Sequence, residues 1–323
     1  MSIHTGNVAQ HSGATGGLGN LTAVAPPPLD RYAFGLPMTP VPRPELRFSA
    51  RPLIAPMLAV ALLWTFAGSV AAHVESTAGI DARSKPAPPT IGYDISYPQC
   101  GGPYPANPAF GIVGVNRGIV FSANPCLGAG SGASQLAWAG PNAQLYANTG
   151  NPGPQLSSHW PSGQTTPREC ATAAKPDPDT VDCAYDYGWN AAADSYAKAV
   201  AAYVSLGWAD PGSNRTPVAN HWWLDVETAN SWRHDQSLNV AALKGAVDYL
   251  ASMGAVSVGI YSSPGMWSQV VGGSSAFATL PSWVAGASTL KGARTGCSGP
   301  GLTGGAIQLT QYLSNGFDAD HLC

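Results

Sequence analysis

The residues best suited to chemistry lie in one short segment, 221–227, which reads His-Trp-Trp-Leu-Asp-Val-Glu. Side chains two positions apart on a β-strand point to the same side, so Trp223, Asp225 and Glu227 share a face, with both carboxyl groups at the strand's carboxyl end. Positions on one face lie about 6.6 Å apart, which lets two carboxyl groups approach one sugar and shift each other's pKa. A carboxylic acid with a raised pKa beside an ionised partner is what glycosidic cleavage needs. Acidic pairs at strand ends also cap loops, and this structural alternative stays open.

Two other expected strand ends carry acids. Asp94 closes the first strand, in Gly-Tyr-Asp-Ile-Ser, while Asp318 and Asp320 follow the last strand, in Gly-Phe-Asp-Ala-Asp. Because the first and last strands of a barrel are neighbours, these acids can converge with those of segment 221–227. The alternative is that Asp94 caps a turn, and that Asp318 and Asp320 satisfy backbone donors near the end of the chain.

Short apolar runs alternate with helical or loop segments after residue 90. They predict a largely parallel sheet, with strands at residues 91–95, 110–115, 144–147, 221–226, 256–261, 282–285 and 306–309. Helices are expected at 191–206 and 238–253, because a glycine follows each of them. We therefore expect one α/β domain over 91–323, a modified TIM-like β/α barrel with the acids at its catalytic, carboxyl-terminal mouth.

The segment 149–219 is too long for an ordinary connection between a strand and a helix. It follows the third expected strand, so it starts on the face of the barrel where active-site loops lie. It is a candidate wall or lid of the site. The alternative is a surface loop that a disulfide holds in place and that has no role in catalysis.

Composition and charge narrow the class of protein. Only 10% of the 323 residues are charged, and the net charge is -3. The chain therefore has no basic stripe of the kind that phosphate contacts require, and nucleic acid is not expected as a partner. No Cys-x-x-Cys occurs and the histidines lack ligand-like spacing, so no metal site is expected. We expect a monomer.

The N-terminal part resembles a targeting region. Residues 1–50 are rich in Gly and Pro and lack hydrophobic periodicity, which indicates disorder or a start codon upstream of the true one. Residues 51–72 read as a signal peptide, with an uncleaved signal anchor as the alternative and as the only membrane association expected. A Pro-rich linker spans 73–90. Both alternatives place the remaining chain outside the cytoplasm, secreted or at the cell surface.

The cysteines agree with export. All six lie after residue 90, and disulfides persist in oxidising compartments. Sequence order cannot choose among the many possible pairings, and we expect neighbours in the sequence to pair: Cys100 with Cys126, Cys170 with Cys183, and Cys297 with Cys323.

Short motifs occur in a fixed order along this part of the chain. They are GYDIS (92–96), LDVE (224–227), GIYSS (259–263), SWVA (282–285), QLTQY (308–312) and GFDAD (316–320). In order and spacing the set resembles the glycoside hydrolase family 25 lysozymes, and in particular an actinobacterial branch of secreted glycoside-hydrolase-like domains whose activity is mostly unassigned. The resemblance implies a modified β/α barrel that cleaves the β-1,4 bond between N-acetylmuramic acid and N-acetylglucosamine in peptidoglycan, without a metal or organic cofactor.

The resemblance also implies residue roles. Glu227 is the expected general acid, and Asp225 is the neighbour that orients or stabilises the reacting 2-acetamido group of the sugar. Asp94 matches the first acid of the family and Asp318 the last, where the family reads v-D-l-N and this chain reads Phe-Asp-Ala-Asp. Converging carboxylates would stabilise an oxocarbenium-like transition state.

Substrate contacts are expected from residues around these acids. The candidates are Trp223, Trp232, Tyr261, Gln311 and Asp320. Flat aromatic rings could stack on sugar faces, although Trp223 could equally fill the barrel interior, where large aromatic side chains are commonly buried.

Two loops depart from the family pattern. Residues 114–118 read Gly-Val-Asn-Arg-Gly where an Ala-Thr-Glu-Gly-like turn is common, and residues 147–152 read Ala-Asn-Thr-Gly-Asn-Pro in place of a Tyr-containing motif. Such loops contact substrate in the family. A second function therefore stays open, a carbohydrate-binding or structural cell-wall protein that keeps the barrel without turnover.

Overall fold

The computed structural model describes residues 91–323, except 131, 209–216 and 218–219. The expected leader at 1–50, targeting segment at 51–72 and linker at 73–90 lie outside the described residues. None of the helices in the described part is long and apolar enough to cross a membrane.

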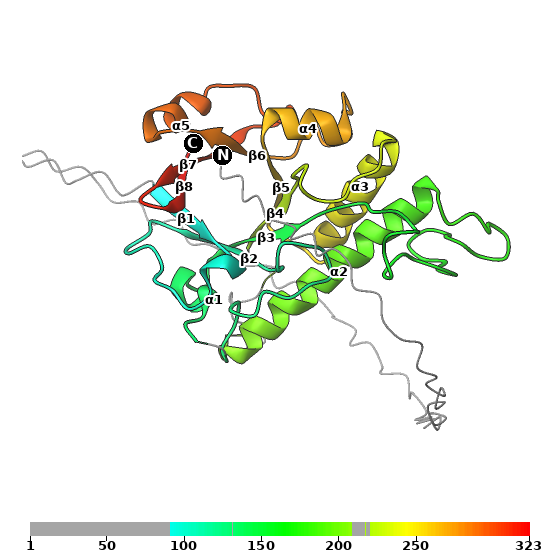
Figure 1. Cartoon of the computed structure of the whole chain (residues 1–323), viewed down its shortest axis with the longest axis horizontal. Coiled ribbons are helices and arrows are strands. Elements are labelled where there is room, and N and C mark those ends of the chain that lie inside the picture. The colour runs from blue at the N-terminus through cyan, green and yellow to red at the C-terminus, as the bar shows by residue number, and fades with distance from the viewer. Residues whose placement is uncertain (1–90, 131, 209–216, 218–219) are drawn as a thin grey trace, which may run out of the picture. The chain divides into compact units, whose positions relative to one another are not determined.

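Eight strands among the described residues close into one barrel (Figure 1). They are β1 (Ile91–Ile95), β2 (Gly111–Gly114), β3 (Gln144–Asn148), β4 (His221–Asp225), β5 (Ser257–Ser262), β6 (Ser282–Ala287), β7 (Ile307–Ser314) and β8 (Phe317–Leu322). Each strand from β1 to β6 runs parallel to the next, whereas β8 is antiparallel to both β7 and β1. The α/β fold class and the modified β/α barrel are thereby confirmed.

The eighth strand corrects the expectation of seven. Asp318 and Asp320 lie within β8 and not in a loop after the last strand. The turn between β7 and β8 is Asn315-Gly316, and both residues have positive φ, 52° and 83°. Asn-Gly suits the tightest hairpin turns because both of its residues tolerate a left-handed backbone. The chain therefore folds straight back, and β8 closes the barrel between β7 and β1.

The helices lie outside the barrel. They are α1 (Gln135–Ala139), α2 (Val181–Ser205), α3 (Gln236–Ser252), α4 (Pro264–Val271) and α5 (Leu290–Gly296). The helix expected at 191–206 begins ten residues earlier, at Val181, where the Thr180 side chain accepts a hydrogen bond from the Cys183 N–H. This bond satisfies one of the free N–H groups at the start of a helix, so α2 can begin immediately after the Pro/Asp-rich stretch.

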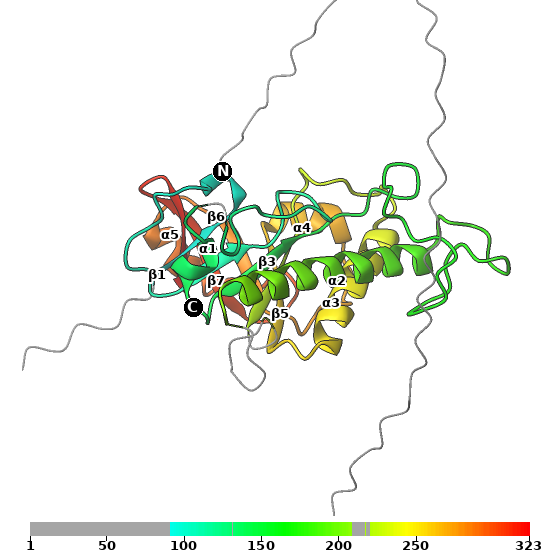
Figure 2. The same ribbon diagram turned by 90° about the horizontal axis from the view of Figure 1, so that it is seen from below.

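Helices α2 and α3 pack against each other at two glycines. A Cβ atom on Gly188 would lie 1.7 Å from the Ala242 carbonyl oxygen, and one on Gly245 would lie 2.0 Å from the Tyr185 carbonyl oxygen. Only hydrogen at these positions allows the two backbones to approach so closely. The two views in Figures 1 and 2 show α2 and α3 side by side along one flank of the barrel.

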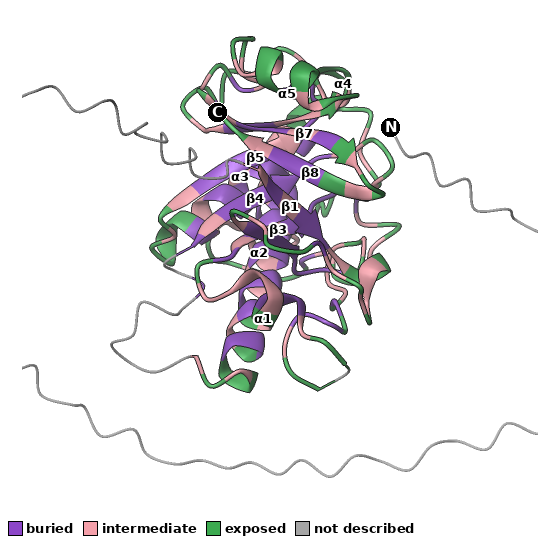
Figure 3. Cartoon of the chain, turned by 90° about the vertical axis from the view of Figure 1, so that its left-hand side faces the viewer, coloured by how far each residue is buried: buried purple, intermediate pink, exposed green. Residues whose placement is uncertain are grey.

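Large apolar side chains fill the barrel and its outer surface. Ile112, Trp223, Trp283 and Leu309 form a buried cluster. On the outer face of β4, Trp222 is fully buried, and its ring lies 6.1 Å from that of Tyr196 on α2. Figure 3 shows the strands mostly buried, with exposed residues gathered on the helices and loops.

Three disulfides join Cys100 to Cys126, Cys170 to Cys183, and Cys297 to Cys323. This confirms the pairing of sequence neighbours. The first disulfide links the loops after β1 and β2, the second fastens the β3–α2 segment to the first turn of α2, and the third ties the end of α5 to the C-terminus. All six cysteines lie outside the eight strands, so the disulfides join loops and helix ends to one another and to the C-terminus.

Candidate active site

The acids predicted from the sequence come together at one end of the barrel. Asp94 on β1 is the direct neighbour of Asp318 on β8, and Asp225 is the last residue of β4, followed closely by Glu227. Asp94 and Asp225 are 8% and 4% exposed, Glu227 is half-buried, and Asp318 reaches solvent. Two deeply held carboxyl groups therefore lie beside two that an incoming ligand can reach.

The Asp225 carboxyl group is held on one side only. Its Oδ2 atom accepts a hydrogen bond of 2.6 Å from Nδ2 of Asn148, while its Oδ1 atom is buried and has no donor among the described residues. The N–H and hydroxyl groups of Thr149 both donate to the Asp225 carbonyl oxygen, at 3.1 and 2.5 Å. The backbone and one carboxylate oxygen are thus fixed, and the other oxygen remains a free acceptor.

Asp94 is held by a chain of hydrogen bonds across the barrel. The Tyr261 hydroxyl donates to Oε1 of Gln311 at 2.8 Å, and Nε2 of Gln311 donates to Oδ2 of Asp94 at 2.9 Å. The first bond fixes which way the Gln311 amide points, because its oxygen is occupied and its nitrogen must face the acid. Tyr261 and Gln311, both expected to contact substrate, are thereby brought into the site.

Electrostatic interactions tie the acids into one site. Burial raises the pKa of Asp94, and the Asp318 carboxylate raises it further. Burial is also the main cause that raises the pKa of Asp225, with Glu227 and Asp94 adding to it. The pKa of Glu227 is raised by burial and then by Asp318, and the pKa of Asp318 is raised by burial. Asp94, Glu227 and Asp318 thus each disfavour ionisation of a neighbouring acid, as in paired catalytic carboxyl groups.

Tyr146 is a site residue that the sequence interpretation missed. Its phenol hydrogen-bonds with the Ser96 side chain, and its pKa is raised by burial and then by Asp94, Asp225 and Glu227. Tyr146 lies two positions before Asn148 on β3, so the strand period places both side chains on one face. The strand period could have predicted Tyr146, because it lies two residues before Asn148, the neighbour of Asp225.

The loop after β4 positions Glu227. Nε1 of Trp232 donates to the Glu227 carbonyl oxygen at 2.8 Å, and the Asn230 N–H donates to the same atom at 3.1 Å. No described residue donates a hydrogen bond to the Glu227 carboxyl group itself. Trp232 is half-buried against the apolar core, so its evident role is to hold this loop, and its contact with substrate stays a prediction.

Two of the expected substrate contacts need correction. Trp223 is 1% exposed in the barrel interior, where its Nε1 donates to Oε1 of Gln144 at 2.7 Å. Asp320 is 0% exposed, and its Oδ1 atom accepts a hydrogen bond of 2.8 Å from Nε1 of Trp283. Neither residue has a surface that a sugar could touch, because both point inward below the mouth of the barrel. We therefore withdraw them as substrate contacts.

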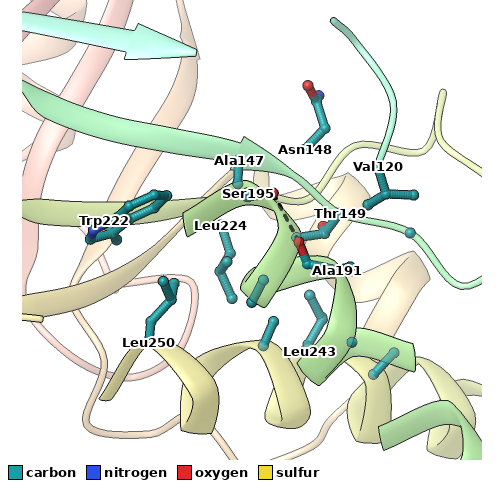
Figure 4. Close-up of a pocket in the computed structure, with 15 residues that line it drawn as sticks. Val120, Ala147, Asn148, Thr149, Ala191, Ser195, Trp222, Leu224, Leu243 and Leu250 are labelled. Atoms are coloured by element: carbon teal, nitrogen blue, oxygen red, sulfur yellow. Dashed lines mark hydrogen bonds between the residues drawn. The ribbon is translucent and has the colours of Figure 1, made fainter. Parts of the chain in front are cut away.

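Two cavities of this part of the chain lie away from the four acids. An apolar cavity of about 20 Å³ separates β3 and β4 from α2 and α3, and in Figure 4 Asn148 points away from it, on the other side of β3. A larger cavity, of about 450 Å³, lies at the opposite end of the strands beside His221 and Cys323. Neither is lined by the four acids. In the part of the chain that the structure describes, no group of three or more His, Cys, Asp or Glu side chains could hold a metal ion.

Known proteins match the part of the chain that contains the Asp225 and Glu227 pair. Residues 212–292 match the family model of lysozyme-like protein 1. Probable GH family 25 lysozyme 4 of Dictyostelium discoideum is 40% identical over 63 residues, which are 20% of this chain and 29% of the relative. Probable GH family 25 lysozyme 3 of the same organism is 39% identical over 64 residues, 20% of this chain and 13% of the relative. Over these 63 and 64 residues the chain is similar to probable lysozymes of glycoside hydrolase family 25.

The matched region has limits. The chain spans less than a third of the length of either curated relative, and residues 212–292 contain neither Asp94 nor Asp318. Among solved structures, the muramidase from Trichobolus zukalii is 17% identical, with a TM-score of 0.44 over 73% of this chain and 94% of that one. That Asp94 and Asp318 lie at the same mouth as Asp225 and Glu227 is therefore shown by the barrel of this chain and not by the comparisons.

Proposed function

We propose that this protein is an exported glycoside hydrolase that cleaves the β-1,4 bonds between N-acetylmuramic acid and N-acetylglucosamine in peptidoglycan. One observation carries the proposal: Asp94, Asp225, Glu227 and Asp318 converge at one mouth of the barrel, where Asp318 raises the pKa of Asp94 and of Glu227, and Glu227 and Asp94 raise the pKa of Asp225. The similarity of residues 212–292 to lysozyme-like proteins supports the same reaction, and we extend it to the actinobacterial branch that the motifs resemble.

Glu227 is the proposed general acid. Its pKa is raised, and no described residue donates a hydrogen bond to its carboxyl group, so the group is stabilised in its protonated form. It would transfer that proton to the glycosidic oxygen as the bond from the anomeric carbon to this oxygen breaks. The leaving sugar then departs as an alcohol, and Glu227 is left as a carboxylate that can accept a proton from the incoming water.

Asp225 is the proposed partner of the sugar's 2-acetamido group. Its Oδ2 atom is occupied by Asn148, and its buried Oδ1 atom is an acceptor without a donor. A buried acceptor left empty is costly unless the substrate supplies the missing hydrogen bond. The N–H of a 2-acetamido group has the right chemistry, and accepting its hydrogen bond would orient this group toward the anomeric carbon.

Asp94 and Asp318 are proposed to stabilise positive charge. They are direct neighbours on antiparallel strands, and the oxocarbenium-like transition state develops charge that nearby carboxylates favour. Tyr261 and Gln311 hold Asp94 in place through the hydrogen bonds described above. This reaction would need no metal and no organic cofactor.

The test is release of soluble muropeptides from purified peptidoglycan. Wild-type protein is expected to release them, and Glu227→Gln to release at least about a thousandfold less, while its melting temperature stays close to that of the wild type. Asp248→Asn on α3 is the control, because this acid pairs with Lys244 and Tyr185 and with none of the four acids. Full activity of Glu227→Gln would show that Glu227 is not the general acid.

A second candidate is a carbohydrate-binding or structural cell-wall protein without turnover. The departures from the family pattern at residues 114–118 and 147–152 favour it, because the loop after β3 starts beside Asp225. Co-sedimentation with peptidoglycan separates the two functions: binding with no soluble product supports the second, and product supports the first. Export in either case is proposed from the three disulfides, with the protein secreted or at the cell surface as a monomer.

A further inference from the structure

Asp320 is a buried acid that the proposed reaction does not use. It is 0% exposed and lies on β8 beside Gln311 of β7. Its Oδ1 atom accepts the Trp283 hydrogen bond, and its Oδ2 atom has no N–H or hydroxyl donor among the described residues. A carboxylate with one free buried oxygen is unfavourable, because it forfeits hydration without regaining all of its hydrogen bonds.

Among the described residues, no Lys, Arg or His forms an ion pair with Asp320. The ion pairs within the described residues involve acids on α2, on α3 and in the β3–α2 segment, and none reaches the mouth of the barrel. The groups that face Asp320 are Asp94 from β1, Trp283 from β6, Gln311 and Tyr312 from β7, and Asp318 from its own strand. Two of these are acids themselves, so ionisation of Asp320 would add a third negative charge.

Asp94 and Asp320 lie on the neighbouring strands β1 and β8, with their carboxyl groups near enough to each other to share a hydrogen bond. Two carboxyl groups can form such a bond only if one of them carries a proton, since ionised carboxylates are acceptors only. Asp94 already accepts a hydrogen bond from Gln311, which favours its ionised form, and it lies close to the mouth. Asp320 is the more deeply buried of the two. The proton therefore belongs on Asp320, and Asp94 is the acceptor.

We propose that Asp320 is an un-ionised carboxylic acid at neutral pH and a positioning residue, which donates its proton in a hydrogen bond to Asp94. With Gln311 as the second donor, it holds Asp94 as a carboxylate aimed into the site. Burial and the nearby charge of Asp94 both raise the pKa of Asp320, in agreement with this assignment. The contribution of Asp320 to glycoside hydrolysis rests on the proposed function, whereas its protonation does not.

Proton release on unfolding tests the protonation directly. Unfolding exposes Asp320 to water, where it ionises at neutral pH, so wild-type protein should release about one proton more than Asp320→Asn. The measurement is calorimetric unfolding at pH 7 in two buffers with different ionisation enthalpies. Asp177→Asn, an exposed acid on the β3–α2 segment, serves as the matched control and should release as many protons as the wild type. Equal proton release from wild type and Asp320→Asn would overturn the proposal.

A second variant covers the case in which Asp320→Asn does not fold. In Asp94→Asn the negative neighbour is gone and the new amide can donate to Asp320, so Asp320 can ionise in the folded state. Proton release should again fall by about one relative to the wild type. An unchanged proton release in this variant would contradict a shared proton between the two acids.

Activity on peptidoglycan tests the positioning role. An asparagine at 320 can accept from Trp283 and donate to Asp94, so Asp320→Asn should retain most of kcat, whereas Asp320→Ala should lose about tenfold or more with little change in KM. Asp94→Asn cannot supply the charge and should be inactive. Equal losses in Asp320→Asn and Asp320→Ala would overturn the positioning role. If the wild type itself released no muropeptides, the proposed function would fail, and proton release would still decide the protonation of Asp320.

Discussion

Nδ2 of Asn148 lies 2.6 Å from Oδ2 of Asp225, and the Asn148 N–H in turn donates to Oδ1 of Asn116 at 2.9 Å. Asn116 and Asn148 belong to the two segments, 114–118 and 147–152, whose sequences depart from the lysozyme pattern. The departures therefore supply support for Asp225 and do not remove it. Two asparagines in series thus connect the residues after β2, through the end of β3, to Asp225 at the end of β4.

Asn148→Ala should impair catalysis more than stability. Without Asn148, the one side-chain donor to its carboxyl group among the described residues, Asp225 loses its fixed orientation, and kcat should fall roughly tenfold to a hundredfold, as expected for a buried hydrogen bond to a charged group. KM and the melting temperature should change little. Asn190→Ala on α2 is the control, because this asparagine bonds to Gln164 away from the acids. A wild-type kcat in Asn148→Ala would show that Asp225 needs no such support.

Asp318→Asn should shift the alkaline limb of the pH profile. The proposed acid Glu227 must be protonated, so activity is lost as pH rises through its raised pKa, and the Asp318 charge is one of the causes of that raised pKa. Removing this charge lowers the pKa of Glu227, and the limb in kcat/KM moves to lower pH. Asp177→Asn should leave the limb in place. A limb that stays fixed in Asp318→Asn would mean that another group controls it.

The convergence of the acids could be predicted from strand period and barrel closure. A period of two fixed the face shared by Asp225 and the side chain two residues earlier, and the alternation of elements placed Asp94 at the same end. The position of Asp320 could not be predicted from strand period and barrel closure alone. It depended on recognising Asn315-Gly316 as a hairpin turn, and without that turn the last two acids were assigned to a loop.

Burial was harder to predict than position. Trp223 shares a strand face with Asp225, which suggested a sugar platform, but that face turns into the barrel and only its last positions reach the mouth. The early start of α2 was also missed, because Gly188 inside the helix weakens the sequence signal. The glycine is explained only by α3, a contact between segments far apart in the sequence.

Asp186→Asn should stabilise the protein at neutral pH. Asp186 is buried with its Oδ2 atom unpaired, and burial raises its pKa to about 6. Because the folded-state pKa exceeds the unfolded value, stability falls as pH rises from about 4 to about 6 and then levels off. Asp186→Asn cannot ionise at this position and therefore does not lose stability over this pH range. Its melting temperature should exceed that of the wild type by a few degrees at pH 7 and match it near pH 4. Thermal unfolding at both pH values measures this, and an equal difference at both would contradict it.

Gly188→Ala should destabilise the protein by about 1–3 kcal/mol or more, because the new methyl group meets backbone and not a flexible side chain. The clash is with the Ala242 carbonyl oxygen, so α2 and α3 must move apart. Gly273→Ala is the control, since a Cβ atom there meets open space and the residue has no positive φ. Urea unfolding of the two variants gives the comparison, and similar midpoints would show that α2 can shift without cost.

Arg233 and Asp179 fasten the β3–α2 segment to the loop that carries Glu227. Two hydrogen bonds of 2.6 Å join the guanidinium to the carboxylate, and the arginine side chain covers Gly153 of the same segment. The pair is partly exposed, so its removal should cost less than about 1 kcal/mol of stability. Its larger effect should be on substrate binding if the segment forms a wall of the site.

Arg233→Met should therefore raise KM for peptidoglycan fragments about two- to fivefold while kcat stays within about twofold. A partly exposed ion pair contributes less than about 1 kcal/mol, which corresponds to at most about a fivefold change in binding. Exchanging the two charges, with Arg233→Asp and Asp179→Arg together, should restore part of the loss because the same two segments are again joined. Lys175→Met is the matched control: this lysine pairs with Glu169 and Asp182 and does not contact the Glu227 loop. Equal effects of Arg233→Met and Lys175→Met would mean that the segment acts only as a surface loop. A KM effect specific to Arg233 would support the wall, because that pair joins the segment to the loop that carries the proposed acid, whereas the ion pairs of Lys175 do not.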